Sequence, residues 1–123
     1  MFNPDVIADA AAALADVQKA GIKVMQGWFN KNNNKCHVTL WDLGEEDENQ
    51  SDDAAEGVRL AVQVTIFSRK DELTLARRIK ELMLNAGFDF EGRNTDDSQP
   101  EDGIYMKAQR FSKFYENEEE INK

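Results

Sequence analysis

The chain is poor in the residues that most often build metal sites and catalytic sites. Its 123 residues contain one cysteine and one histidine. A single cysteine excludes an internal disulfide, as is usual for proteins made in a reducing cytoplasm. His37 offers no histidine cluster for a metal, and a strand through Cys36 and His37 turns the cysteine toward the core and the histidine toward the surface. We therefore predict no metal site and no Cys–His catalytic pair.

Several longer patterns are missing as well. No apolar run approaches the roughly 20 residues of a membrane helix. Asp5 and Asp9 interrupt the N-terminal segment, where a secretory signal needs a long apolar stretch, so we expect no such signal. The seven glycines are scattered and form no phosphate-binding loop, and the clustered acids lack the spacing of a calcium loop. We predict that the chain is not an enzyme, binds no cofactor and does not enter a membrane.

Acidic charge is in excess but unevenly placed. The formal net charge is −9, and of the 24 acidic residues seven lie in residues 44–56, six in 89–102 and four in 116–123. The rest of the chain holds more bases than acids, but its only basic cluster, residues 77–80, shares a predicted helix with acids. This layout argues against specific nucleic-acid binding. It predicts acidic loops at about 44–56 and 92–103 and a frayed acidic tail at about 116–123.

The N-terminal segment has the apolar spacing of an amphipathic helix. Asn3 is placed to cap this helix and Pro4 to occupy its first position, where the missing N–H of proline costs nothing. Apolar residues then recur at helical spacing as far as Gly21, which ends the predicted helix. Residues 22–29 are predicted to form a short strand or an extended arm.

The clearest pattern in the chain is a strand followed directly by a helix. Apolar and polar residues alternate from Val58 to Phe67, as in a strand with one buried face. Ser68 then offers a hydroxyl to cap a helix over residues 70–86, and Gly87 ends that helix.

Further alternation predicts strands around residues 36–41, 88–91 and 104–109, with a bulge or a turn near Arg110. No internal repeat or linker divides the chain, so we predict one domain over residues 1–123. Helices at both ends of an antiparallel run favour an α+β fold, with a mainly antiparallel sheet and two helices packed on one face.

The other face of this sheet is predicted to stay open and to contact other proteins. The apolar residues of 104–109 are expected to turn toward the helices, which leaves aromatic and polar side chains outside. The residues expected on the open face are Trp41, Arg59, Gln63, Thr65, Tyr105, Lys107 and Gln109. On the arm, Trp28 and Phe29 are adjacent, so one of them points away from the core.

Two sets of residues follow as candidates for contacts with other proteins. The first set is predicted to bind a protein partner: Trp28, Phe29, Trp41, Arg59, Lys107 and Arg110. The second set belongs to the first acidic loop and is predicted to contact a neighbouring copy of the chain: Glu45, Glu46, Asp47, Glu48, Asp52 and Asp53.

The order of these elements resembles a known family. Residues 62–69 (VQVTIFSR) run directly into the helical start at 71–76 (DELTLA), and Gly87-Phe88 is followed by strands that contain Tyr105 and Arg110-Phe111. This order is similar to that of small tail-terminator or tail-completion proteins of long-tailed bacteriophages and prophages.

The resemblance spans about residues 4–115, with its distinctive part at 57–111, and it implies a function. Members of the family are non-enzymatic subunits of a hexameric ring that caps the tail tube and gives head-completion proteins a docking surface. The implied partners are further copies of the chain, the tube protein and the connector proteins, in a virion tail assembled in the bacterial cytoplasm. DNA would pass through such a ring, and acidic loops facing the lumen would repel its phosphates.

Two alternatives stay open at this point. A head–tail connector or another minor tail protein would share the same fold class. A small acidic binding module, such as a toxin immunity protein or a DNA mimic, would instead present its carboxylates to a basic partner. Salt dependence distinguishes the acidic binding module from an assembled tail protein. Binding between opposite charges weakens steeply as ionic strength rises, whereas apolar contacts in a ring persist.

Overall fold

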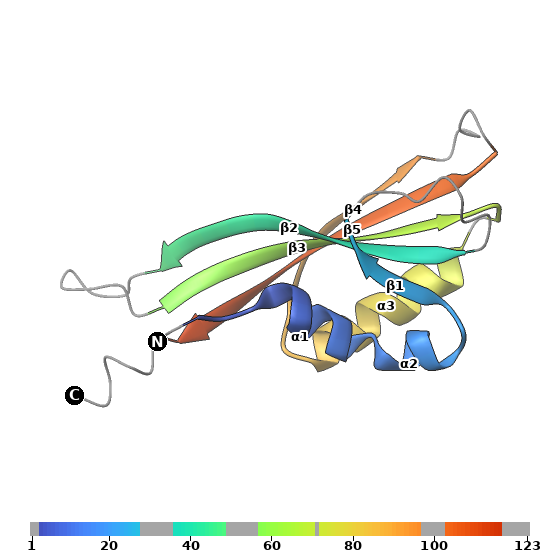
Figure 1. Ribbon diagram of the computed structural model, residues 1–123. Helices are drawn as coiled ribbons and strands as arrows, with labels where there is room; N and C mark the ends of the chain where they lie inside the picture. The colour runs from blue at the N-terminus through green and yellow to red at the C-terminus, as the bar shows by residue number, and fades with distance from the viewer. Residues whose placement is uncertain (1–2, 28–35, 49–56, 71, 97–102, 117–123) are drawn as a thin grey trace.

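The computed structural model describes residues 3–27, 36–48, 57–70, 72–96 and 103–116. These residues form a five-stranded sheet with three helices gathered below it (Figure 1). The elements are α1 (Val6–Ala13), α2 (Ala15–Lys19), β1 (Lys23–Gln26), β2 (His37–Glu48), β3 (Gly57–Ser68), α3 (Leu73–Asn85), β4 (Asp89–Asp96) and β5 (Tyr105–Glu116).

The sheet has the strand order β1-β2-β3-β5-β4. β1 pairs parallel to β2, and the three other pairings are antiparallel. The prediction of an α+β fold with a mainly antiparallel sheet is therefore confirmed. β1 is much shorter than β2 and pairs only with its first residues, His37–Leu40.

The N-terminal helix is broken where we expected it to be continuous. α1 ends at Ala13, Leu14 separates it from α2, and three helices rather than two cover the sheet. The predicted caps are wrong, since Asp5 caps α1 and its Oδ1 accepts a hydrogen bond of 3.0 Å from the backbone N–H of Ala8. A carboxylate is a stronger partner than an amide for the positive end of a helix. α2 ends at Lys19, and Gly21 follows its C-cap Ala20 with a φ of 91°, close to the predicted end of the helix.

The second predicted helix begins later than expected and ends where expected. Ser68 closes β3, and its Oγ donates to Glu72 Oε1 at 3.3 Å and accepts from the backbone N–H of Lys70 at 3.2 Å, so it holds the connecting turn instead of capping α3. At the other end Gly87 has a φ of 93°, and the N–H of Phe88 donates to the carbonyl of Met83 at 3.1 Å. This is the Schellman arrangement that glycine favours.

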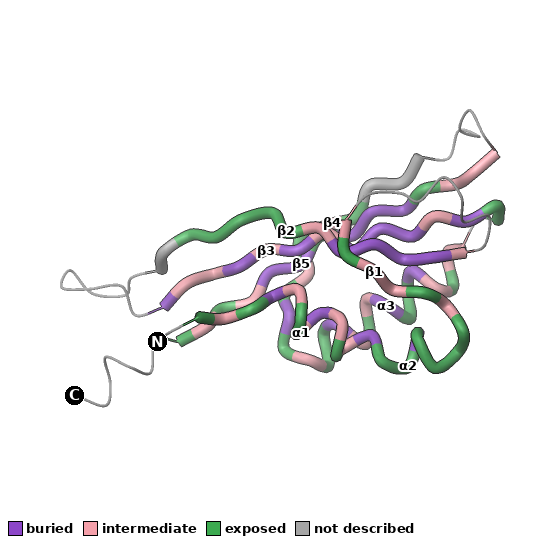
Figure 2. The backbone as a smooth tube through the Cα atoms, viewed as in Figure 1, coloured by how far each residue is buried: buried purple, intermediate pink, exposed green. Residues whose placement is uncertain are grey.

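The core lies between the helices and the lower face of the sheet. Figure 2 marks the buried residues of both layers in purple. Alternate strand residues supply one side of this core, and the helices supply the other. Its largest fully buried apolar side chains are Val38, Leu40, Val62, Val64 and Phe111 from the sheet, Ile79 and Met83 from α3, and Leu14 from the junction between α1 and α2.

The two faces of β5 are reversed relative to our prediction. Its register places Lys107 beside Ile66 and Gln109 beside Val64, and Gln109 Nε2 donates to the backbone carbonyl of Ala76 in α3 at 2.7 Å. Tyr105, Lys107 and Gln109 therefore lie on the helix side of the sheet, and Lys107 is only 5% exposed. The prediction that these three residues face outward is wrong, because backbone acceptors in α3 let polar groups be buried there.

Two predicted acidic loops are partly strand. Gly44–Glu48 belong to β2, and residues 92–96 belong to β4. Each strand contains a register shift, one between Asp42 and Gly44 and one between Phe90 and Gly92. The bulge expected near Arg110 is therefore in β4, directly opposite that residue, while β5 itself is continuous. Pairing with a neighbouring strand outweighs the turn propensity of these acidic segments.

Candidate interaction surface

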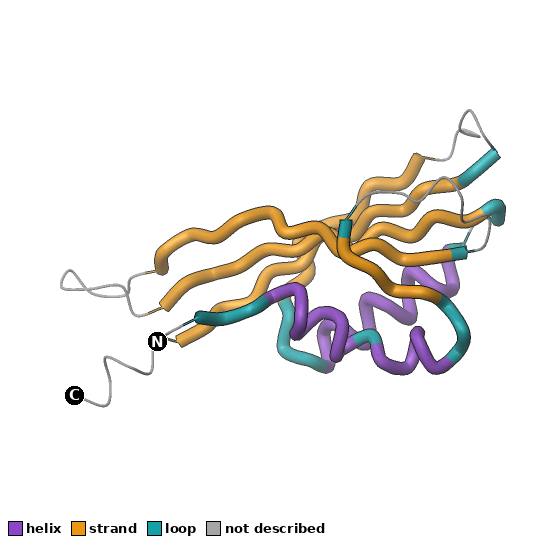
Figure 3. The backbone as a smooth tube through the Cα atoms, in the orientation of Figure 1, coloured by secondary structure: helices purple, strands orange, loops and turns teal. Residues whose placement is uncertain are grey.

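The upper face of the sheet carries no helix in the described part of the chain, as the separation of helices and strands in Figure 3 shows. We call this surface the open face. Large apolar side chains are exposed on it: Leu43 is 43% exposed, and Met106 and Phe114 are each 37% exposed. Leu43 and Met106 line one hollow, while Phe114 lies eight residues further along β5. Apolar side chains left exposed on a sheet face are available for contact with another molecule.

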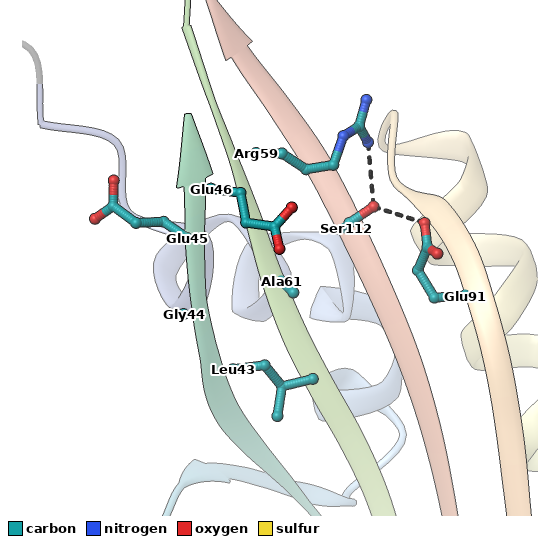
Figure 4. A pocket seen from close by; sticks show the side chains of 8 residues that line it. All are labelled: Leu43, Gly44, Glu45, Glu46, Arg59, Ala61, Glu91 and Ser112. Atoms are coloured by element: carbon teal, nitrogen blue, oxygen red, sulfur yellow. Dashed lines mark hydrogen bonds between the residues drawn. The ribbon is translucent and has the colours of Figure 1, made fainter. Parts of the chain in front are cut away.

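A hollow of about 350 Å³ lies on the open face, across β2, β3, β5 and β4 (Figure 4). Arg59 lines it, with Nη1 donating to Asp89 Oδ2 at 2.8 Å and to Ser112 Oγ at 3.1 Å. Ser112 Oγ in turn donates to Glu91 Oε1 at 2.9 Å. Glu46 points toward this network from β2. These bonds fix the positions of the polar side chains on one half of the open face.

A second hollow of about 220 Å³ lies beside the first and is more apolar in its lining. Leu43 lines both hollows, so the two form a continuous uneven surface. Trp41, Phe67 and Met106 line the second hollow, and Phe67 stacks on His37 with ring centroids 5.4 Å apart. His37 is buried, so the expectation that it lies at the surface is wrong.

The predicted interaction residues fall into three groups. Trp41, Arg59 and Arg110 lie on the open face, at the positions the register gives them. Lys107 lies on the helix side and is buried, which contradicts its predicted place on the open face. Trp28 and Phe29 lie outside the described residues.

The acidic candidates are divided in a similar way. Glu45 and Glu46 are exposed on β2, and they lie on opposite faces, because Glu45 pairs with Leu60 and Glu46 with Arg59. Asp47 and Glu48 also belong to β2, where their backbones pair with Val58 and Gly57. Asp52 and Asp53 lie outside the described residues.

Sequence reasoning missed Leu43, Met106 and Phe114 as surface residues. Leu43 lies two residues after Trp41 and therefore on the same face of β2, but it was missed because the strand was predicted only around residues 36–41. Met106 and Phe114 were missed because the alternation of β5 was assigned to the wrong face. A tyrosine or lysine that alternates with small apolar residues gives no independent signal of direction.

The ionisable groups with displaced pKa values lie away from the open face. The hydroxyl of Tyr115 donates to Asp9 Oδ2 at 2.6 Å, and burial, together with this carboxylate, raises the pKa of Tyr115. Burial and the charge of Glu72 raise the pKa of Cys36, against a smaller lowering by its hydrogen bond with Ser68. A raised thiol pKa makes Cys36 a poor nucleophile at neutral pH.

The described residues contain no group of three or more histidine, cysteine and acidic side chains placed to hold a metal ion. Within the same ranges, none of the helices has the length and apolar character to cross a membrane.

Comparison with known proteins gives a distant likeness among solved structures. No protein-family model and no curated protein matches the sequence. Among solved structures, the chain is similar to the sheath/tube terminator of an extracellular contractile injection system, PVC, determined by cryo-EM in the extended state. The TM-score is 0.40 and the identity 9%, over 94% of this chain and 59% of that chain. A likeness at this distance does not define a family.

Proposed function

We propose that the chain is a structural, non-enzymatic protein of a phage or prophage tail, whose copies form a ring that ends the tail tube and joins it to the head-completion proteins. The resemblance of residues 57–111 to tail-completion proteins supports this proposal. It is also supported by one structural observation, which is the open face. A subunit that works only as one part of an assembly needs such a surface, because its apolar side chains gain stability only when a neighbour covers them.

The open face suits a permanent contact better than a transient one. Leu43, Met106 and Phe114 add apolar area to it, while Arg59, Asp89 and Ser112 hold each other in place before any partner arrives. Prior ordering of this kind lowers the entropy cost of association. In the ring we propose, the open face contacts a neighbouring tail protein, and the acidic segments keep the DNA phosphates at a distance.

Electron microscopy of tails tests the function. Deleting the gene from the phage or prophage that encodes it should give tails of uncontrolled length without attached heads. Tails of normal length with heads attached would overturn the proposal.

Point variants locate the contact. Phe114→Asp and Leu43→Asp should reproduce the defect of the deletion, since each places a charge in the apolar part of the open face. Leu84→Asp is the matched control, because Leu84 is 45% exposed on α3, away from the open face. A defect as large in the Leu84 variant would show that the open face is not the relevant surface.

A second function is favoured by one observation. Glu45 and Glu46 stand on an ordered strand, whereas carboxylates on a loop would be less fixed. An acidic module that neutralises a basic partner needs fixed carboxylates of this kind. Salt separates the two functions, since a complex held by opposite charges should weaken by orders of magnitude between low and high salt, while contacts through the open face should persist.

A further inference from the structure

The bulge in β4 separates the charges of that strand between the two faces of the sheet. It adds one residue, Glu91, which turns to the open face, where its Oε1 accepts a hydrogen bond from Ser112 Oγ at 2.9 Å (Figure 4). Asp89 lies on the same face and binds Arg59. The acidic side chains of β4 that the structure describes therefore belong to the open face, and each has a partner there.

Arg93 lies on the other face of β4, toward the helices. It pairs with Gln109, whose side chain donates to the backbone carbonyl of Ala76 in the first turn of α3. Arg93 is therefore level with the turn that contains Arg77, the residue after Ala76. The side chain of Arg93 is exposed, so it is accessible from outside the molecule.

The side of α3 that faces β4 carries two more bases. Lys80 Nζ lies 4.1 Å from the centroid of the Phe90 ring, so this side of the helix lies against β4. Arg77 is three residues before Lys80 and shares its side of the helix. Arg77, Lys80 and Arg93 thus gather on one surface from two elements that are separate in the sequence. We call these three residues the basic strip.

The charge of the basic strip is not neutralised within the described part of the chain. There, neither Arg77 nor Arg93 forms an ion pair or a hydrogen bond through its side chain, and both are exposed. Glu81, the acid next to Lys80 in the sequence, is engaged by Arg78 at 3.4 Å. The strip is a basic surface in a chain whose formal net charge is −9, and it is complementary to an acidic partner.

The surroundings of the strip suit a protein segment better than a nucleic acid. Guanidinium groups bind carboxylates through two parallel hydrogen bonds. Phe90 lies beside Lys80, and Leu73 lies one turn before Arg77, and both apolar side chains are only half-buried, so a segment that carries apolar residues can pack there. A nucleic acid is a longer polyanion, and the acidic excess of the chain would repel its phosphates on either side of the strip.

We propose that the basic strip binds an acidic segment of a partner protein, with carboxylates of that segment on Arg77 and Arg93 and its apolar side chains beside Phe90. The strip lies on the helix side and is separate from the open face. The proposal therefore does not depend on the function proposed above.

Fluorescence anisotropy of a labelled acidic peptide tests the proposal with the purified protein. The probe is a peptide of repeated Glu-Glu-Leu triplets, and a peptide of repeated Gln-Gln-Leu triplets is its neutral control. The measurement is made at about 0.1 M salt, where a Debye length of about 10 Å screens the distant acids of the chain more than a direct contact. The wild type should bind the acidic peptide and not the neutral one.

Matched variants locate the binding. R77E/R93E should bind the acidic peptide about tenfold more weakly, because two attractive contacts become repulsive. K19E/K23E makes the same change in net charge on exposed lysines of α2 and β1, at the opposite end of the sheet from β4, and should bind as the wild type does. R77Q/R93Q removes the charges without reversing them and should give a smaller loss. Circular dichroism checks that each variant is folded.

Four results would overturn the proposal. They are a wild type that does not bind the acidic peptide, equal losses in the two charge-matched variants, tighter binding of a labelled oligothymidylate at the same strip, and weaker self-association of R77E/R93E in light scattering, which would make a second copy of the chain the occupant. The function proposed above fails separately, because tails that stay normal after deletion of the gene would remove the tail role and leave the basic strip standing.

Discussion

The two faces of β5 differ more than their amino-acid composition suggests. Phe111 and Phe114 are three residues apart on one strand, yet Phe111 is fully buried under the helices and Phe114 is 37% exposed on the open face. The buried side also holds Lys107, Gln109 and Lys113, while the open side holds Met106 and Ala108. Apolar character thus does not identify the core face of this strand.

The difference teaches how polar groups become buried. Gln109 donates to the carbonyl of Ala76, and Lys113 Nζ donates to the carbonyl of Ala86 at 3.3 Å, so the backbone of α3 and its C-terminal end supply the acceptors. The open face has no helix to supply such acceptors in the described part of the chain. Side chains on the helix side of β5 should therefore contribute most to folding stability, and those on the open face should contribute most to association.

Replacing the two phenylalanines should show the largest contrast. Phe111→Ala should lower the free energy of unfolding by about 3–5 kcal/mol, because it leaves a cavity in a packed core. Phe114→Ala should lower it by only about 1–2 kcal/mol, because more than a third of this side chain is already exposed. Urea unfolding followed by circular dichroism measures both values. Equal losses in the two variants would mean that the faces do not divide stability as we describe.

A smaller contrast is expected between the adjacent residues Gln109 and Arg110. Gln109→Ala removes the buried hydrogen bond to Ala76 and leaves space beside α3, so we expect a loss of about 2–3 kcal/mol. Arg110→Ala should cost less than about 0.5 kcal/mol in the free energy of unfolding. The same unfolding measurement applies, made at a concentration where the chain is dissociated. If the free energy of unfolding falls more in the Arg110 variant than in the Gln109 variant, then Arg110, and not Gln109, lies on the buried face of β5.

The hydrogen bond between Tyr115 and Asp9 should add about 1 kcal/mol on the helix side. Tyr115→Phe removes it, and Tyr105→Phe is the matched control, since no hydrogen bond of the Tyr105 hydroxyl occurs among the described residues. Because burial and Asp9 raise the pKa of Tyr115, the folded state favours the neutral hydroxyl. This contribution is complete below pH 10, the ordinary pKa of tyrosine, and is lost as the pH rises further.

Unfolding in urea across pH 7–11 checks this sign. The difference in the free energy of unfolding between the wild type and Tyr115→Phe should shrink above about pH 10, the ordinary pKa of tyrosine. A difference that grows with pH would contradict the assignment of the neutral hydroxyl as the donor to Asp9.

The smallest effect on stability is expected for the charged network of the open face. Arg59→Ala breaks the ion pair with Asp89, but exposed pairs contribute only about 0–1 kcal/mol and are screened by salt. We expect a loss below about 0.5 kcal/mol that disappears in high salt. Thermal unfolding at two salt concentrations measures it. A loss of several kcal/mol would show that this network stabilises the fold instead of ordering a contact surface.

Much of the fold could be predicted from local patterns. The alternation from Val58 to Phe67, the helix after it and the stop at Gly87 are local signals that agree with one another, and the structure confirms these three elements. Their agreement is what makes a segment predictable, because no distant contact has to overrule the local preference.

What could not be predicted depends on distant contacts. Gly44–Glu48 form a strand because β3 pairs with them, although their own composition favours a loop. The burial of Gln109 depends on the carbonyl of Ala76, far away in the sequence. The open face was expected in principle, but its apolar members follow from the full length of β2 and from the direction in which the side chains of β5 alternate. Which of the two candidate sets contact another protein stays a prediction, and its members Trp28, Phe29, Asp52 and Asp53 lie outside the described residues.

The most direct test of the account is the mass of the purified wild-type protein in solution, measured by light scattering as its concentration is raised, with electron microscopy of the same samples. The account predicts a single oligomer of defined size that appears as closed rings. A protein that remains monomeric at every concentration, or that forms an open series of aggregates without a closed ring, would contradict it.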